Sequence, residues 1–221
     1  MPSQLRFTLA ALTAALLLCQ PLRAFDSPLS DEAVREAYFL GQRHDDSLAV
    51  ALAKYKKALP LPETGPHIAS VTFFTPFALL VEASSQHPSY SAQQAALDHR
   101  GRKETVQIIV EIRFTDSYGA YIVRPTSSSS DAPKGFAFRP YNFWKDFDVQ
   151  AFSADEEEVL PLSFSGEPSV LCSDTGGCTL TGATVTLEFP ADAFPSDSAT
   201  VLVTPPEGEA VSVDFDLSSF R

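Results

Sequence analysis

The sequence predicts a mainly β protein with some helix, namely an antiparallel β-sandwich preceded by an N-terminal helical arm. Residues Thr105 to Thr115 alternate between apolar and polar side chains, which is typical of an antiparallel strand with one buried face. From Phe136 to the end, short β-prone segments follow one another and are separated by turn residues. The Ig-like type is favoured among sandwiches, although alternation alone does not separate it from a jelly roll or a small barrel.

Residues 1–24 have the layout of a secretory signal peptide. Arg6 supplies a positive charge, Phe7 to Leu18 carry none, and Ala24 is a small residue suited to cleavage. The mature chain is therefore predicted to begin near Phe25. Two alternatives stay open. In the first the segment remains as a membrane anchor, although its 12 uncharged residues fall short of the about 20 that a spanning helix needs. In the second, Cys19 carries a lipid.

Composition and charge limit the kinds of protein this can be. Removal of 24 residues would leave 197 of the 221, which suits one domain, and 44% hydrophobic residues suffice for a core. From Phe25 to Lys145 the sequence has 13 acidic and 13 basic residues, whereas from Asp146 onward it has 15 acidic residues and one basic residue, Arg221. A surface this acidic repels phosphate backbones, so we expect no nucleic-acid partner.

The mature chain would hold two cysteines, Cys172 and Cys178. An even number in an exported chain favours a disulfide. The intervening segment contains an aspartate and two glycines, which suits a tight reversal between two strands. Five intervening residues do not match a Cys-x-x-Cys redox pair.

The predicted helical arm covers residues 25–66. Ser30 suits a helix N-cap, because Asp31 and Glu32 follow it in the first turn. A second apolar stripe has helical spacing and extends the arm to Pro60, as two helices with a bend or one long helix; it consists of Leu48, Leu52, Tyr55 and Leu59.

Residues 67–221 are predicted to form the sandwich domain, with one short helix near 92–100. Ser91 and Gln94 match a capping box at the start of that helix. Phe77 to Ser85 suits either a buried strand or a short helix. Turns are expected at Ser165-Gly166 and at several later glycine and proline positions. The other predicted strands are Ile68 to Thr75, Ala120 to Arg124, Phe147 to Phe152, Val159 to Phe164, Ser169 to Leu171, Ala183 to Phe189, Ser198 to Thr204 and Ala210 to Phe215.

Three short segments resemble parts of uncharacterised exported bacterial proteins with sandwich folds. These segments are Val201 to Gly208, Val213 to Leu217 and Tyr90 to Ala95. The resemblance implies export and a sandwich fold. It implies no activity and no site residue.

No catalytic residue, cofactor or metal site is predicted. The sequence lacks a nucleophile elbow and a glycine-rich phosphate loop, and its four histidines do not have metal-ligand spacing. The acidic run Asp155 to Glu158, and the pair Asp192 and Asp197, could offer oxygens to calcium, but a solvated turn is favoured because the calcium-loop pattern is absent. An enzyme would need Glu82, Glu111 or Asp116 to face another acid across a cleft.

Aromatic residues crowd into residues 136–147. From this segment we select Arg139, Tyr141, Phe143 and Trp144 as candidate ligand-binding residues, because exposed rings can stack on sugars and a cation can bond hydroxyls. The competing interpretation, which is favoured, places the single tryptophan in the core.

The function predicted from the sequence is that of a non-enzymatic envelope or extracellular protein acting through protein-protein contacts. It would be exported to the periplasm or beyond and would have no membrane span after cleavage. The alternative is a module that binds carbohydrate or another surface ligand, such as a surface glycan, through segment 136–147.

Overall fold

The computed structural model describes residues 24–43, 45–87, 91–125, 134–174 and 176–221. The chain is mainly β with some helices, and its described strand pairs are antiparallel, as predicted. The predicted leader lies outside the described residues apart from Ala24, and so does most of the loop that follows Pro125. Within the described ranges, no helix combines the length and apolar character needed to cross a membrane.

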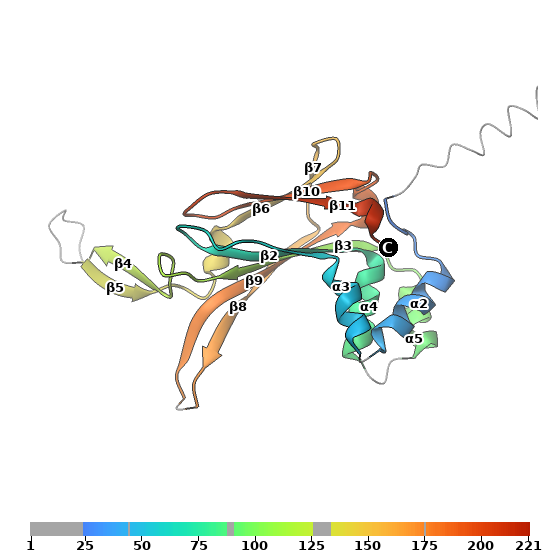
Figure 1. Ribbon diagram of the computed structural model, residues 1–221, viewed down its shortest axis with the longest axis horizontal. Coiled ribbons are helices and arrows are strands. Elements are labelled where there is room, and N and C mark those ends of the chain that lie inside the picture. Colours follow the sequence, from blue (N-terminus) through green and yellow to red (C-terminus); the bar gives the residue numbers. More distant parts are fainter. Residues whose placement is uncertain (1–23, 44, 88–90, 126–133, 175) are drawn as a thin grey trace, which may run out of the picture.

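The larger sheet has five strands in the order β1-β2-β3-β9-β8 (Figure 1). On β3 the residues at alternate positions from Val106 to Ile112 are buried, which confirms the face predicted from alternation. The strands of this sheet are β1 (Lys56–Ala58), β2 (His67–Phe74), β3 (Thr105–Arg113), β8 (Ser163–Cys172) and β9 (Cys178–Pro190).

The smaller sheet has four strands in the order β11-β10-β6-β7 and lies above the larger one in Figure 1. β10 has the predicted bounds, and β6 and β11 each begin one residue later than predicted. The strands are β6 (Asp148–Ser153), β7 (Glu158–Val159), β10 (Ser198–Thr204) and β11 (Val211–Asp216).

The main hydrophobic core lies between the two sheets, whose inner faces belong to one buried cluster. Phe73 of β2 joins the two layers, since its ring centroid lies 5.5 Å from that of Phe215 on β11 and 5.2 Å from that of Phe194. The predicted inward residues Val185, Leu187 and Phe189 are all buried here. Two single-turn 3-10 helices, η2 (Ala191–Ala193) and η3 (Leu217–Ser219), border this core.

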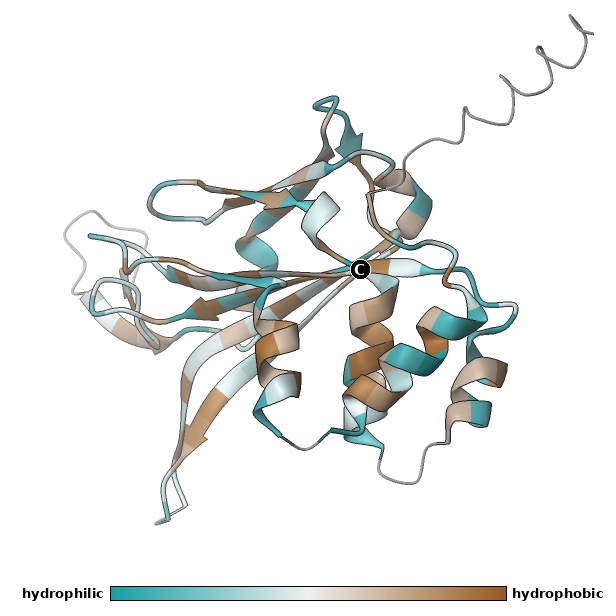
Figure 2. Cartoon of the chain, turned by 45° about the vertical axis from the view of Figure 1, so that its right-hand side comes forward, coloured by the Kyte–Doolittle hydropathy of each residue, from teal (hydrophilic) through white to brown (hydrophobic). Residues whose placement is uncertain are grey.

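Four helices lie beside the larger sheet: α2 (Asp31–Gly41), α3 (Asp46–Ala53), α4 (Pro76–Gln86) and α5 (Ala92–His99). Ser30 is the N-cap of α2, as predicted, and accepts a hydrogen bond of 3.1 Å from the Ala33 amide. The apolar stretches of the helices, brown in Figure 2, pack on one another. Their shared cluster consists of Leu29, Ala33, Val34, Ala37, Phe77, Val81 and Ala95. The arm therefore covers its apolar face with α4 and α5 of its own chain.

The helix predicted to continue to Pro60 is wrong in its second half. α3 ends at Ala53, and Lys56–Ala58 forms the edge strand β1, which pairs with β2. Tyr55 is buried, but against Phe74 and Phe220 rather than along a helix face. Pairing with an existing sheet edge overrides the helical spacing of the stripe.

The turn predicted at Ser165-Gly166 is also wrong, because both residues lie inside β8. β8 runs without a break over ten residues, so it contains all of the predicted strand 169–171 and only the end of the predicted strand 159–164, whose first residue belongs to β7. Gly166 suits this position because the Trp144 ring occupies the space beside it, and a Cβ there would lie 2.5 Å from Cδ2 of that ring. The glycine marks a close approach rather than a reversal.

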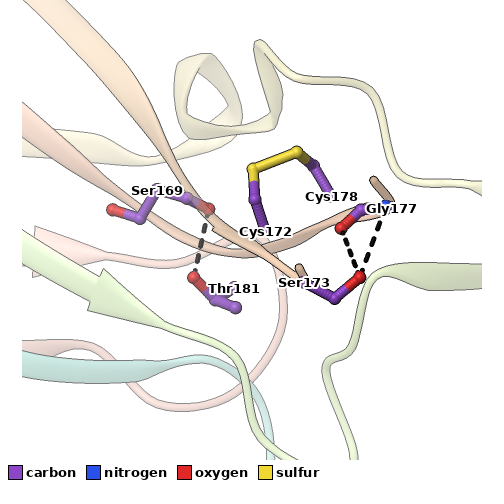
Figure 3. Close-up of a disulfide and its surroundings, with 6 residues drawn as sticks. All are labelled: Ser169, Cys172, Ser173, Gly177, Cys178 and Thr181. Carbon is purple, nitrogen blue, oxygen red and sulfur yellow. Dashed lines mark hydrogen bonds between the residues drawn. A yellow bond between two sulfur atoms is a disulfide. The ribbon is translucent and has the colours of Figure 1, made fainter. Parts of the chain in front are cut away.

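Cys172 and Cys178 form the predicted disulfide, with the sulfurs 2.04 Å apart (Figure 3). They are paired residues at the far end of the β8–β9 hairpin. The Ser173 hydroxyl and the Gly177 amide and carbonyl bond across the same reversal. The bridge therefore closes the end of a hairpin that projects from the body (Figure 1).

A second hairpin projects from the body between β3 and β6. It consists of β4 (Tyr121–Pro125) and β5 (Lys134–Phe138), which pair only with each other among the described strands. The chain then passes through the 3-10 helix η1 (Phe143–Asp146) into β6. A two-stranded sheet has no second layer of its own to bury a face against.

Candidate functional site

The structure divides the four candidate residues selected from the sequence. Phe143 and Trp144 lie on η1 and are buried in the main core, with 1% and 8% of their surface exposed. The Trp144 ring packs on Phe164, with 5.4 Å between centroids. Neither side chain offers a ring face to a ligand on the surface, so only Tyr141 and Arg139 of the four remain accessible.

Arg139 is held at the base of the β4–β5 hairpin. Its guanidinium carbon lies 3.5 Å from the centroid of the Tyr118 ring, and its Nε donates to the Gly119 carbonyl at 2.9 Å. Burial raises the pKa of Tyr118 to about 12, although the charge of Arg139 acts in the opposite direction. The guanidinium of Arg139 therefore makes a cation–π contact with a buried ring, and this contact anchors the hairpin to the body.

We expect Trp144 to emit at short wavelength and to resist acrylamide, because its indole is packed in the core. It is the single tryptophan, so the emission of the folded protein reports on this site alone. A quenchable, red-shifted emission would instead mean that η1 leaves the core and that the indole is free for a ligand. Unfolding in urea supplies the fully exposed reference.

The exposed aromatic residues lie elsewhere, on the hairpin itself. Tyr121, Phe136 and Phe138 are 59%, 80% and 75% exposed. Tyr121 and Phe138 are paired across the two strands, with ring centroids 5.0 Å apart, and Phe136 is two residues from Phe138 on the same face. We call these three residues the hairpin face. The sequence placed Phe136 and Phe138 in the aromatic cluster, but Tyr121 was missed because its pairing partner is distant along the chain.

A second exposed apolar surface lies on β8 and the segment before it. Leu160, Leu162, Phe164 and Val170 are 74%, 61%, 42% and 46% exposed. We call these four residues the overhang face, because β8 is the outermost strand of the larger sheet.

A cleft of about 600 Å³ lies between the N-terminal segment, the end of α5 and the turn after β9. Glu104 lines it and is only 7% exposed. Its Oε1 accepts from the Leu29 amide at 2.6 Å and lies 2.8 Å from Nε2 of His99, so the carboxylate ties the N-terminal segment to α5. Oε2 is buried and bonds to no other described residue. These contacts give Glu104 a structural role.

Among the carboxylates considered for catalysis, Glu111 is engaged in a similar way. Glu111 bonds Arg113 at 2.6 Å, Lys56 at 3.1 Å and the Ser70 hydroxyl at 3.1 Å. Burial by itself raises the pKa of Glu111, but these three partners outweigh it and lower the pKa to about 2. Burial raises the pKa of Glu82. Glu111 is therefore the centre of an ion-pair cluster on the outer face of the sheet.

We expect Glu111→Gln to reduce stability at neutral pH and to have no effect in acid. The folded pKa lies near 2 and the ordinary value is 4.5, so the stabilisation is complete above about 4.5 and is lost as the pH falls towards 2. Because the cluster is partly exposed, the loss at about pH 7 should stay below about 1 kcal/mol. Urea unfolding of both proteins across this range measures it. Glu209→Gln, on the exposed turn before β11, serves as the control, and a difference that persists in acid would contradict the assignment.

Comparison of this chain with known proteins identifies no relative. Neither the protein-family models, nor the curated proteins, nor the solved structures contain a match to this chain. Among the described residues, no three His, Cys, Asp or Glu side chains are grouped so as to hold a metal ion. The two exposed apolar faces are therefore the candidate sites of this chain.

Proposed function

We propose that this protein is exported to the periplasm or the extracellular space and acts there, without catalysis, by binding other proteins. The observation that carries the proposal is the hairpin face, where Tyr121, Phe136 and Phe138 stand together and mostly in solvent. Three large aromatic side chains on a projecting ribbon cost solubility unless a partner covers them. Aromatic residues of this kind supply much of the binding energy of protein interfaces.

Two observations support export. The leader has the layout of a signal peptide, and the disulfide Cys172–Cys178 is of a kind that persists in oxidising compartments. We keep the division into a leader of residues 1–24, an arm of residues 25–66 and a sandwich domain of residues 67–221 as part of this proposal.

We also infer an Ig-like sandwich, and strand order is what supports it. In an Ig sandwich the seven strands are lettered A to G in chain order. One sheet has the strand order A-B-E-D and the other the order C-F-G. If β2 is counted as the first strand, the order β2-β3-β9-β8 matches the first sheet, and β6-β10-β11 matches the second with β7 added at its edge. The helices α4 and α5 and the β4–β5 hairpin would then be insertions, and β1 an addition.

Photo-crosslinking tests the proposed function. A photoreactive phenylalanine analogue replaces Phe136 in the host that makes the protein, and a second version carries it at Val50, which is 71% exposed on α3. We expect light-dependent adducts with protein from position 136 and not from position 50. Failure to find any protein adduct at position 136 would overturn the proposal.

Carbohydrate binding is the second candidate, because the exposed rings of Tyr141, 60% exposed, and of the hairpin face could stack on sugars. Arg139 is less suited to bond sugar hydroxyls, since its Nε and its guanidinium face are already engaged. A glycan array distinguishes the two candidates. Binding that Phe136→Ser and Phe138→Ser abolish would favour the glycan, whereas an array without hits removes it.

A further inference from the structure

We propose that the protein associates with itself, the hairpin face of one copy packing on the overhang face of a second copy. The proposal rests on the proposed function and names the partner. The hairpin face is mostly exposed, and the overhang face is covered in part, where Trp144 packs on Phe164. In Figures 1 and 2 the two hairpins leave the body in different directions. Each face can therefore be covered from outside the chain.

The overhang face has the sequence pattern of a buried surface. From 160 to 172 the even positions are apolar, glycine or cysteine, and the odd positions of β8 are mostly polar. Register places Phe164 and Val170 opposite Leu187 and Leu180, which are both buried in the main core. Alternation of this kind specifies a face that is covered, yet nearly all of β8 is exposed. The smaller sheet therefore does not extend far enough to cover it.

The hairpin face is likewise an apolar surface that is exposed to solvent, here on a two-stranded ribbon. Its aromatic residues share one face of a two-stranded sheet, and such a sheet is marginally stable in water on its own. The anchor at Arg139 fixes the base of the ribbon and leaves its aromatic face free.

The opposite charges of the segments around the two faces favour a second copy of this chain as the partner. From Tyr121 to Arg139 the sequence has three basic residues and one acidic residue. Between Lys145 and Arg221 it has no basic residue, and Glu158, Glu167 and Asp174 lie along the β7–β9 region. One apolar face thus has a basic surrounding segment and the other an acidic one, so the two attract each other and each repels its own kind.

Pro168 favours packing of faces over pairing of strand edges. It lies within β8, the outer strand of the sheet, and has no amide hydrogen to donate. A proline at an edge interrupts the row of donors and acceptors that an added strand would need.

Sedimentation velocity on the mature, oxidised chain tests the proposal, between about 1 and about 100 µM. We expect concentration-dependent association. Phe138→Ser on the hairpin face and Val170→Ser on the overhang face should each weaken it by at least about tenfold. Val50→Ser, an exposed apolar position on α3, should leave it unchanged.

A mixture of the two weakened variants, each with its own fluorophore, identifies the contact. Phe138→Ser keeps an intact overhang face and Val170→Ser an intact hairpin face, so the mixture should form the complex that neither forms alone. Contacts between like faces would leave the mixture dissociated, and that result overturns the proposal. A monomer at all concentrations overturns it too. If position 136 is then still crosslinked to a different protein, the proposed function survives this failure.

Discussion

Phe73→Ala is expected to lower the free energy of unfolding by about 3–5 kcal/mol, the range for a buried phenylalanine reduced to alanine. Phe73 is fully buried and its ring contacts those of Phe194, Phe215 and Phe220, which come from the far end of the chain. The cavity would open between the two sheets, where neither layer can move in without breaking its own strand pairing.

Denaturant titration followed by Trp144 fluorescence and by circular dichroism measures this loss. Phe136→Ala is the matched control, because it makes the same chemical change at a side chain that is 80% exposed. Similar losses for both variants would mean that Phe73 does not join the sheets as described.

Gly182→Ala is expected to have the second largest effect, about 3 kcal/mol, at the upper end of what overpacking costs. Gly182 pairs with Arg113 on β3 and with Ser169 on β8, so it lies inside the sheet with a strand on each side. A Cβ on Gly182 would lie 2.0 Å from the Ile112 carbonyl oxygen. That oxygen belongs to a strand held in register over nine residue pairs, so it cannot give way locally.

Gly119→Ala provides the control, because the nearest atom to its added Cβ is 3.8 Å away. The midpoint of urea unfolding for the two variants gives the comparison. Equal midpoints would show that the β3–β9 pairing tolerates a side chain at position 182.

The local sequence pattern was sufficient to predict structure where a residue's conformation depends on its neighbours along the chain. Alternation at Thr105 to Thr115 and at Ser198 to Thr204 identified β3 and β10, since a half-buried strand requires that period. Ser30 identified the start of α2 through a bond to an amide three residues away. Two cysteines separated by five residues, two of them glycines, identified the disulfide.

The local sequence pattern gave wrong predictions where contacts with a distant segment determine the conformation. Tyr55 has helical spacing to Leu48 and Leu52, yet the residues that follow it form strand β1, because they pair with β2. Gly166 has the composition of a turn, yet a ring from residue 144 explains it. For the same reason the sequence could not divide the aromatic segment, because Phe143, Trp144 and Phe138 are all aromatic and only packing separates the buried rings from the exposed one.

The sequence by itself determined the strand periods, the helix caps, the disulfide and the concentration of acidic residues after Lys145, because each depends on residue type and short spacing. Only the tertiary structure decided which apolar faces are covered. Alternation specifies that β8 has an apolar side, but whether a second layer reaches that side depends on how far the opposite sheet extends. Exposure of the hairpin and overhang faces is therefore a property of the assembled layers, and no single segment encodes it.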